Sequence, residues 1–326
     1  MTSNLKERLM PIAGKLREFE EHFNRSLGGH AGLIGEMAAH ILDAPGKRIR
    51  PAMYLLSSGA CPGGRDIEAT PVYAAVAIEL IHTATLLHDD VNDGARERRG
   101  RPAAGQLWGN LAAVLMGDHL FAKAFRILVD GGDQRVLETV SEASERVAVG
   151  ELLQVQETRN FEVTEQDYLR IIGNKTASLF SAACEAGALT NGNDAERERF
   201  RDFGEFVGLG FQIADDLLDY LGDVAQTGKP SGTDLKSGNI TLPLIYALQN
   251  AGDDGRHRVM EAVAQPAVNG FGEVVEFVRV NGGFDYARRR AAEYRKKALD
   301  LLSGLSESSY RLALEEVVNH SVDRQA

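Results

Sequence analysis

The chain has 326 residues, of which 44% are hydrophobic and 25% charged, and its formal net charge is −11. These fractions are typical of a soluble globular protein and exclude global disorder, collagen-like repeats and low-complexity scaffolds. The excess of carboxylates argues against a nucleic-acid partner, which would favour a basic surface. Two cysteines, Cys61 and Cys184, are too few for a disulfide framework or a cysteine zinc site, which suits a reducing cytosol.

No segment has the pattern of a signal peptide or a membrane span. Residues 1–25 interleave charged with apolar residues and lack an apolar signal-peptide core. The most apolar stretch, residues 73–87, contains Glu79 and His82 and is shorter than a span requires. We therefore expect a cytoplasmic protein without an integral membrane segment.

Apolar residues recur at spacings of three and four along almost the whole chain, which predicts helices nearly everywhere. The expected helices cover residues 5–27, 31–42, 50–57, 67–90, 107–128, 135–158, 164–189 and 195–220, and more follow after Leu242. Glycine and proline supply breaks at residues 44–46, 61–64, 99–102, 131–132 and 228–230. No strand pair is evident, and no break is long enough for an interdomain linker. We expect one all-α domain over residues 1–326.

A short acidic motif occurs twice, each time at the end of an apolar helix. The two copies are Asp89-Asp90-Val91-Asn92-Asp93 and Asp215-Asp216-Leu217-Leu218-Asp219. The first and last aspartates of each copy lie one helical turn apart, about 6 Å along the axis. Such carboxylates repel one another unless cations compensate them, and hard oxygen ligands favour Mg²⁺ or Mn²⁺ over Zn²⁺. A single copy would indicate a solvated helix end, whereas two copies favour metal binding.

Basic residues gather beside glycine and proline turns. They lie in residues 46–51 and 98–102, and Lys229 follows the second acidic motif. Arginine and lysine bind phosphate oxygens, although a surface charge cluster is the alternative interpretation. Together with the paired carboxylates they favour an anionic, metal-chelating ligand such as a diphosphate or triphosphate. The sequence lacks both the Gly-x-x-x-x-Gly-Lys-Ser/Thr and the Gly-x-Gly-x-x-Gly nucleotide-binding loops.

This set of motifs resembles that of the trans-isoprenyl diphosphate synthases, the polyprenyl synthetase family, over nearly the full length of the chain. The motifs are Gly46-Lys47-Arg48-Ile49-Arg50-Pro51, Glu79-Leu80-Ile81-His82, the first Asp motif with Arg98-Arg99-Gly100, Gly173-Asn174-Lys175-Thr176-Ala177, Gly210-Phe211-Gln212 before the second Asp motif, Gly228-Lys229-Pro230 through Asp234, and Thr241-Leu242-Pro243. The resemblance implies a bundle of ten or more helices around a central cavity, and a homodimer. It also implies a Mg²⁺-dependent prenyltransferase that condenses isopentenyl diphosphate head-to-tail with an allylic diphosphate.

The resemblance further implies roles for individual residues. Asp89, Asp93 and Asp215 would bind three Mg²⁺ ions, which Mn²⁺ can replace, while Asp90, Asp216 and Asp219 would orient ligands and metal-bound water. Arg98, Lys175 and Lys229 would hold the allylic diphosphate, and Lys47, Arg50, His82 and Arg99 would hold isopentenyl diphosphate. Thr176, Gln212 and the Lys175 carbonyl would face the allylic cation. A lone histidine on an apolar helix is more often a core residue, so His82 is included only because its position matches the family.

Two positions bear on how this chain differs from its relatives. Asn239 stands where many relatives have a further lysine for the allylic diphosphate. Ala84 and Thr85 stand where short-chain relatives carry bulky aromatics, so we expect an open tunnel and a medium-to-long product, octaprenyl at the centre of the range. Ordinary helix packing is the alternative for Ala84. Deeper candidates for the end of the tunnel are His119, Phe121 and Phe125.

Three other functions stay open. A short-chain farnesyl or geranylgeranyl diphosphate synthase is the nearest alternative. A class I terpene cyclase normally carries a different second metal site, so residues 215–219, together with Lys47 and Arg50, argue against it. A regulatory subunit of a heteromeric prenyl synthase usually loses its Asp motifs, and this chain has both.

Overall fold

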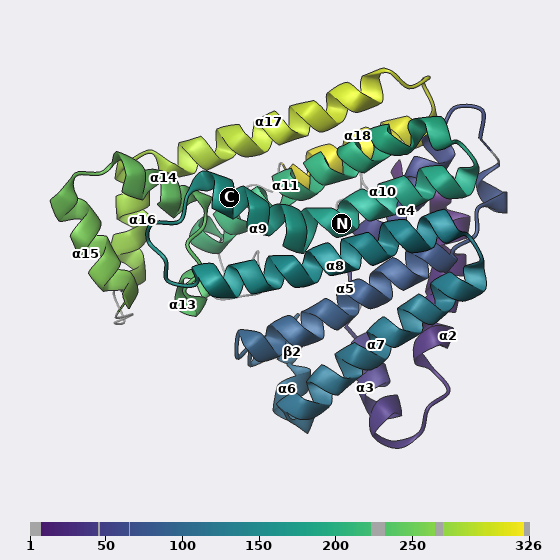
Figure 1. Cartoon of the computed structure of the whole chain (residues 1–326), viewed down its shortest axis with the longest axis horizontal. Coiled ribbons are helices and arrows are strands. Elements are labelled where there is room, and N and C mark those ends of the chain that lie inside the picture. Colours follow the sequence, from purple (N-terminus) through teal and green to yellow (C-terminus); the bar gives the residue numbers. More distant parts are fainter. Residues whose placement is uncertain (1–7, 45, 65, 223–231, 265–269, 323–326) are drawn as a thin grey trace. The chain divides into compact units, whose positions relative to one another are not determined.

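The computed structural model describes residues 8–44, 46–64, 66–222, 232–264 and 270–322. Helices make up nearly all of this part of the chain (Figure 1), which confirms the predicted all-α class and the expectation of ten or more helices. Lys229 and the predicted break at residues 228–230 lie outside the described residues.

The α-helices, in chain order, are α2 (Ala13–Leu27), α3 (Gly32–Leu42), α4 (Ile49–Ala60), α5 (Tyr73–Asn92), α6 (Ala104–Trp108), α7 (Asn110–Gly131), α8 (Gln134–Glu157), α9 (Glu165–Ile172), α10 (Ser178–Asn191), α11 (Arg197–Leu221), α13 (Thr233–Ser237), α14 (Leu242–Asn250), α15 (Asp253–Ala264), α16 (Gly270–Val280), α17 (Gly283–Ser303) and α18 (Ser309–Val322). Short 3₁₀ turns are η1 (Met10–Ile12), η2 (Ile67–Ala69) and η4 (Asp194–Glu196), and η3 (Gly173–Ala177) is a π-helical turn.

Contacts divide the chain into two compact units, each built from several segments. Unit 1 consists of Met1–Ser144, Leu179–Gly204 and Leu299–Val317, and unit 2 of Glu145–Ser178, Glu205–Ala298 and Val318–Ala326. The first Asp motif belongs to unit 1 and the second to unit 2. A single domain over residues 1–326 stays a prediction.

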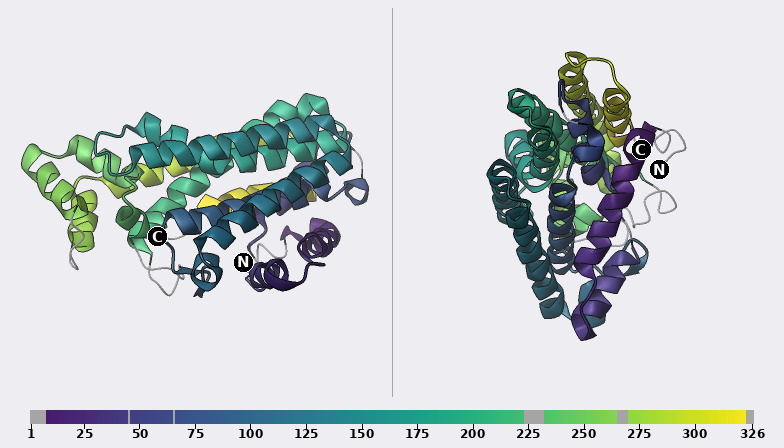
Figure 2. Two further views of the ribbon diagram at one scale, coloured as in Figure 1. Left: turned by 60° about the horizontal axis from the view of Figure 1, so that its bottom comes forward. Right: turned by 90° about the vertical axis from the view of Figure 1, so that its right-hand side faces the viewer.

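Helix α5 forms the core of unit 1 and lies beside α7 (Figures 1 and 2). Every residue from Ala74 to Ile81 is buried, Glu79 included, as expected for a helix that is covered on all sides. The two helices approach closely at Gly117 of α7, where a Cβ would lie 2.2 Å from the Nε2 atom of His88. A larger residue at Gly117 would therefore displace the imidazole of His88 at the end of α5.

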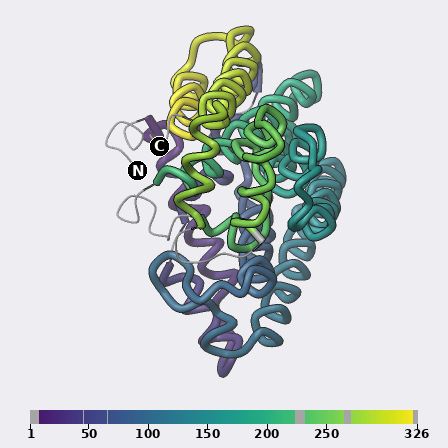
Figure 3. The backbone as a smooth tube through the Cα atoms, turned by 90° about the vertical axis from the view of Figure 1, so that its left-hand side faces the viewer, coloured from purple at the N-terminus to yellow at the C-terminus, as the bar shows by residue number. Residues whose placement is uncertain are grey.

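Unit 2 has its own hydrophobic core, formed by side chains from α9, α11, α14, α15, α16 and α17. Tyr168 of α9, Ile213 and Leu217 of α11, and Val274 of α16 belong to it. Helices α15 and α16 lie side by side (Figures 1 and 3). This core supports the part of α11 that leads into the second Asp motif.

Several predicted helices are interrupted or shortened. The predicted helix 67–90 is divided into η2 and α5 because Pro71 lacks an N–H group and keeps the preceding Thr70 extended, at φ −71° and ψ 120°. Gly109, at φ +83°, separates α6 from α7 within the predicted helix 107–128. The predicted helix 164–189 contains the π-helical turn η3. In the first predicted helix, α2 begins only at Ala13, after the 3₁₀ turn that contains Pro11.

The expectation that no strands pair was wrong at one point. Strands β1 (Glu97–Arg98) and β2 (Arg101–Pro102) form a two-stranded antiparallel hairpin in which Arg98 pairs with Arg101. The two residues between them, Arg99 and Gly100, both have positive φ angles, +54° and +74°. This is the backbone that a two-residue hairpin turn requires, and the periodicity of the sequence does not reveal it.

Candidate active site

The first Asp motif ends α5, and its side chains point in different directions. Asp89 is half-buried, Asp93 is exposed, and Asp90 is buried. Asp90 accepts hydrogen bonds on Oδ1 from Nε of Arg98 at 2.7 Å and forms an ion pair with Nη2 of Arg98 at 2.5 Å. Successive residues of a helix are about 100° apart, so Asp89 and Asp90 point in different directions, and Asp93 lies one helical turn beyond Asp89.

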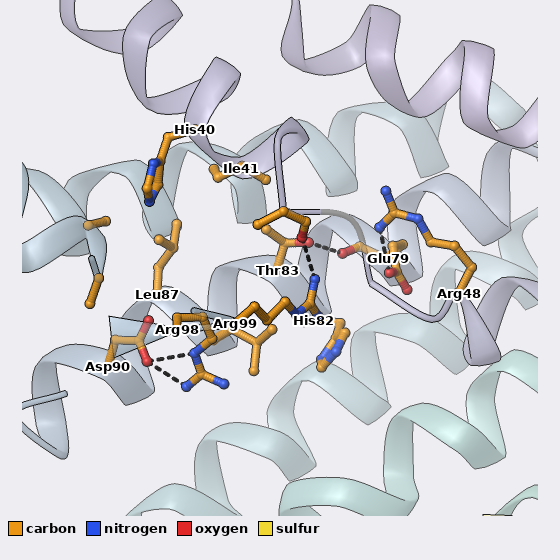
Figure 4. A pocket seen from close by; sticks show the side chains of 14 residues that line it. His40, Ile41, Arg48, Glu79, His82, Thr83, Leu87, Asp90, Arg98 and Arg99 are labelled. Carbon is orange, nitrogen blue, oxygen red and sulfur yellow. Dashed lines mark hydrogen bonds and ion pairs between the residues drawn. The ribbon is translucent and has the colours of Figure 1, made fainter. Parts of the chain in front are cut away.

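A pocket within unit 1 lies beside this motif (Figure 4). Asp90 lines it together with three of the residues predicted to bind diphosphate, His82, Arg98 and Arg99. Its apolar lining includes Ile41 of α3 and Leu87 of α5, which lie on the same side as His40 (Figure 4). Lys47 and Arg50, the other predicted ligands of isopentenyl diphosphate, do not line this pocket.

Arg48, which the sequence analysis did not single out, holds the turn between Lys47 and Arg50. Its backbone is left-handed, at φ +53°, a conformation that is costly for a residue with a Cβ. Its guanidinium donates from Nε to Glu20 Oε1 and from Nη1 to Glu79 Oε1, each at 2.9 Å, and lies 4.5 Å from the centroid of the Phe23 ring. The ion pair also compensates the buried charge of Glu79. The position of Glu79 within an apolar segment of the sequence was the signal that could have indicated such a partner.

Arg50 and His82 have strongly shifted pKa values. The Arg50 guanidinium lies 4.4 Å from the centroid of the Phe180 ring, and no described residue accepts a hydrogen bond from its buried Nε. Burial lowers the pKa of Arg50 to about 10, although Glu79 opposes the shift. Burial, and then the charges of Arg50 and Arg99, lower the pKa of His82 well below its usual range. The imidazole is therefore neutral near pH 7.

The residues expected to control product length lie one to two turns before Asp89. Ala84 has no exposed surface, and Thr85 is half-buried with its hydroxyl donating to the His82 carbonyl oxygen at 2.8 Å. Neither residue lines the pocket beside the first motif. The ring of Phe121, one of the deeper candidates, lies 5.9 Å from that of His88.

The aspartates of the second Asp motif, in unit 2, also differ in their surroundings. Asp215 is exposed and Asp216 is buried. The carboxylate of Asp219 accepts from the backbone N–H groups of Thr233 at 3.0 Å and Asp234 at 3.1 Å, and so joins the end of α11 to the first turn of α13. The backbone N–H of Asn239, which follows α13, donates to the Asp234 carbonyl oxygen at 2.8 Å.

Thr176 and Gln212, predicted to act together, are in direct contact. Thr176 donates from Oγ1 to Gln212 Oε1 at 2.8 Å, and Gln212 donates from Nε2 to Asp216 Oδ1 at 2.7 Å. The hydroxyl of Tyr168 donates to Asp216 Oδ2 at 2.6 Å. Burial raises the pKa of Asp216 to about 7, against the opposing effect of these two hydrogen bonds. The sequence analysis missed Tyr168, because nothing in α9 indicates which carboxylate its hydroxyl meets.

The π-helical turn η3 carries Lys175 and Thr176, and such turns occur frequently at functional sites. The Nζ atom of Lys175 lies 3.0 Å from Glu151 Oε2 and 2.9 Å from Oε1, so Glu151 of α8 holds the amine. Helix α8 packs directly on the turn at Gly150, where a Cβ would lie 2.4 Å from the Lys175 backbone nitrogen. Neither Glu151 nor the need for glycine at 150 was foreseen.

The two motifs offer donors of the kind that Mg²⁺ prefers. Each presents carboxylate oxygens at two positions one helical turn apart. In the part of the chain that the structure describes, no three histidine, cysteine, aspartate or glutamate side chains are grouped so as to hold a metal ion. Mg²⁺ usually retains several waters and is bound by one or two carboxylates together with substrate phosphates. Asp89 and Asp93 in unit 1, and Asp215 in unit 2, each offer carboxylate oxygens of this kind.

Comparison with known proteins gives the family. The sequence model of the family described as polyprenyl synthetase matches residues 31–277. The chain belongs to the polyprenyl synthetase family. As a member, it is a trans-prenyltransferase, an enzyme of a family that uses isoprenoid diphosphate substrates. This confirms the resemblance inferred from the motifs.

Relatives of this polyprenyl synthetase match it over nearly its whole length. The chain is 39% identical over 316 residues to the all-trans-nonaprenyl-diphosphate synthase (geranyl-diphosphate specific) of Rhodobacter capsulatus, with 97% of each chain covered. It is 38% identical over 300 residues to the octaprenyl diphosphate synthase of Escherichia coli, with 91% of this chain and 92% of the relative covered.

A solved structure shares the fold of this polyprenyl synthetase. The polyprenyl synthase of Caulobacter crescentus, complexed with calcium and isoprenyl diphosphate, matches with a TM-score of 0.90 at 36% identity, over 98% of each chain. A divalent metal and a diphosphate ligand therefore occur together in a relative. Among the described residues of the present chain, no helix is both long and apolar enough to cross a bilayer.

Proposed function

We propose that this polyprenyl synthetase condenses isopentenyl diphosphate head-to-tail with an allylic diphosphate to make an all-trans polyprenyl diphosphate, octaprenyl diphosphate in our central expectation. The observation that carries the proposal is the set of cationic donors around the left-handed turns at Arg48 and Arg99, together with neutral His82 of α5, next to an aspartate motif. A diphosphate compensates such a cluster, whereas an apolar or neutral ligand does not.

Isopentenyl diphosphate would be held by Lys47, Arg50, His82 and Arg99. Arg50 supports this role because its buried Nε has no hydrogen-bond acceptor among the described residues, and an unpaired buried donor costs about 1–3 kcal/mol until a ligand satisfies it. Arg99 donates from Nη1 to the Ala44 carbonyl oxygen at 2.6 Å, which orients its guanidinium. Neutral His82 would contribute a hydrogen bond without adding to the charge.

The allylic diphosphate would be held by Arg98, Lys175 and Lys229, with Mg²⁺ bound by Asp89, Asp93 and Asp215. Three ions are expected, and Mn²⁺ can replace them. When bound, the metal stabilises the charge that develops on the leaving diphosphate. The ion pairs of Arg98 with Asp90 and of Lys175 with Glu151 support the assignment, since each keeps a flexible cation in one orientation before the substrate binds.

Cleavage of the allylic carbon–oxygen bond leaves a carbocation, and the isopentenyl double bond then attacks it. Oxygen atoms directed at this cation lower its energy electrostatically. Thr176, Gln212 and the Lys175 carbonyl are proposed for this role. The contact between the Thr176 hydroxyl and the Gln212 amide oxygen supports the pairing of the first two. With asparagine at position 239, the allylic diphosphate has one charged partner fewer than in many relatives.

A long product and a homodimer complete the proposal. The small residues Ala84 and Thr85, and the names of the nonaprenyl and octaprenyl relatives, support a medium-to-long chain. Leu111 and Leu115, one turn apart on α7, are 74% and 56% exposed, and exposed apolar side chains at such spacing support burial against a second copy. A cytoplasmic location stays a prediction.

The deciding experiment is product analysis. The purified protein is incubated with isopentenyl diphosphate, farnesyl diphosphate and Mg²⁺, and the products are separated by chain length, with EDTA as control. We expect a metal-dependent ladder that ends near octaprenyl. A short product would retain the reaction and overturn the assignment of Ala84 and Thr85. No elongation at all would reopen the terpene cyclase and regulatory-subunit alternatives.

A further inference from the structure

Tyr168 begins a continuous chain of hydrogen bonds that ends at Thr176, all within unit 2. Its hydroxyl donates to Asp216 Oδ2 at 2.6 Å, Asp216 Oδ1 accepts from Gln212 Nε2 at 2.7 Å, and Gln212 Oε1 accepts from Thr176 at 2.8 Å. Three of the four residues, Tyr168, Asp216 and Thr176, are buried. Bulk water therefore does not compete freely for these bonds, and the chain has the satisfied partners that a buried polar network requires.

This series of hydrogen bonds joins two segments of the protein at two positions. Tyr168 and Thr176 belong to the continuous segment of α9 and η3, whereas Gln212 and Asp216 lie one turn apart on α11. Each bond between the two segments restrains the other, because a shift of α11 against α9 would break both. The network thus fixes the position of Gln212, along the axis of α11, relative to Thr176.

The carboxylate of Asp216 also sets the direction of every hydrogen bond in the chain. Asp216 accepts on one oxygen from Tyr168 and on the other from the Gln212 NH₂ group, so the Gln212 amide turns its oxygen toward Thr176. Thr176 then uses its single hydrogen on that oxygen. The hydroxyl hydrogen of Thr176 is thus used within the network, and the remaining lone pairs of the threonine and glutamine oxygens are left for an electropositive neighbour.

We propose that Tyr168 is a positioning residue for the condensation, which acts through Asp216 to hold the Gln212 and Thr176 oxygens in the orientation that stabilises the allylic cation. The inference rests on the proposed function, since it presupposes that a cation forms next to these oxygens. Tyr168 itself touches neither substrate. Its effect is on the barrier of the chemical step rather than on the binding of either diphosphate.

The test compares Tyr168→Phe with the wild-type enzyme in steady-state elongation. The substitution keeps the ring that packs in the core of unit 2 and removes only the hydroxyl. We expect kcat to fall at least tenfold while the KM values for both substrates stay within threefold. A kcat within twofold of wild type, or a loss confined to KM, would overturn the proposal.

The matched control is Tyr54→Phe. Tyr54 is a fully buried tyrosine of unit 1, and its hydroxyl donates to the Pro71 carbonyl oxygen at 2.6 Å. Its removal should lower the melting temperature and leave kcat unchanged. An equal fall of kcat in Tyr54→Phe would show that the loss in Tyr168→Phe is a general effect of destabilisation, and would count against the proposal.

A double-mutant cycle with Gln212→Ala separates positioning from any structural effect of Tyr168. If Tyr168 acts only through Gln212, the double variant has the kcat of Gln212→Ala alone, because the group to be positioned is already gone. Additive losses would overturn the inference. Wild-type turnover in the same assay tests the proposed function separately: an inactive wild type refutes that function, whereas an active wild type with additive losses refutes only the role of Tyr168.

Discussion

Arg98 directs two guanidinium nitrogens, Nε at 2.7 Å and Nη2 at 2.5 Å, to a single carboxylate oxygen of Asp90 (Figure 4). One aspartate of the first motif is therefore engaged by a cation of the protein itself. Asp89 lies about 100° further round α5 and is not part of this pair. The motif thus contains one aspartate that orients an arginine, and two further aspartates, Asp89 and Asp93, that lie one helical turn apart.

Replacing Asp90 should weaken substrate binding without abolishing turnover. In Asp90→Asn the acceptor of the Arg98 bonds loses its negative charge, at a cost of about 1–2 kcal/mol. We expect the KM for the allylic diphosphate to rise roughly tenfold, since about 1.4 kcal/mol corresponds to a factor of ten, while elongation continues. Steady-state kinetics with each substrate varied in turn provide the measurement. An inactive but folded Asp90→Asn protein would place Asp90 among the metal ligands instead.

The proposed metal ligands should behave differently. Asp89→Ala or Asp215→Ala removes a carboxylate that Mg²⁺ requires, so elongation should fall at least 1,000-fold, about 4 kcal/mol or more of transition-state stabilisation. The melting temperature should change little, because Asp215 is exposed and Asp89 half-buried. EDTA should abolish wild-type activity, and added Mg²⁺ should restore it.

Asp130→Ala is the matched control for these substitutions. Asp130 is an exposed carboxylate of α7 whose partner is Arg126, and it has no proposed part in catalysis. Its loss should leave the elongation rate and its Mg²⁺ dependence unchanged. Full activity in Asp89→Ala or Asp215→Ala would refute the assignment of metal ligands.

His82 should make the protein less stable in mild acid. Its pKa is lowered well below the usual value in the folded state, chiefly by burial, whereas in the unfolded chain it is about 6.5. Below that pH the unfolded state takes up a proton that the folded state excludes. The stabilising contribution is therefore complete above about pH 6.5 and is lost as the pH falls, by at most about 1.4 kcal/mol per pH unit.

Urea unfolding of wild type and His82→Asn between pH 5 and pH 7.5 checks this prediction. The difference in the free energy of unfolding should move in favour of the variant as the pH falls, since asparagine does not titrate. Groups such as Asp216 titrate in both proteins and cancel in the comparison. A difference that is constant over this range would mean that the folded-state pKa of His82 is not lowered.

Ala84→Phe tests the tunnel. A phenyl ring at this position should end elongation early and give a product several isoprene units shorter than wild type, as separated by chromatography. Ala84 has no exposed surface, so the added ring must displace its neighbours in either case and the melting temperature will fall. An unchanged product distribution in a folded variant would mean that Ala84 serves only to pack α5.

The helical class of the fold was predictable because it follows from local properties of the sequence. Apolar spacing of three and four predicts helices, and it placed α8 at residues 135–158, where the structure has Gln134–Glu157. The errors occur where backbone conformation depends on a few residues that do not change this spacing. Pro71, Gly109 and the π-helical turn at residues 173–177 each interrupt an apolar pattern that continues on both sides.

The candidate site likewise has some features that a local sequence pattern predicts and others that only the packing of helices decides. The residues proposed to carry the chemistry were selected from the two Asp motifs and the adjacent arginines, because charged residues beside apolar helices are unusual enough to be recognised one segment at a time. The hydrogen-bonding partners of these residues could not be predicted in this way. Tyr168 and Asp216 are 48 residues apart in sequence, and Arg48 meets Glu79 across 31 residues. A hydrogen bond depends on distances of a few tenths of an ångström between helices, which packing sets and no local pattern encodes.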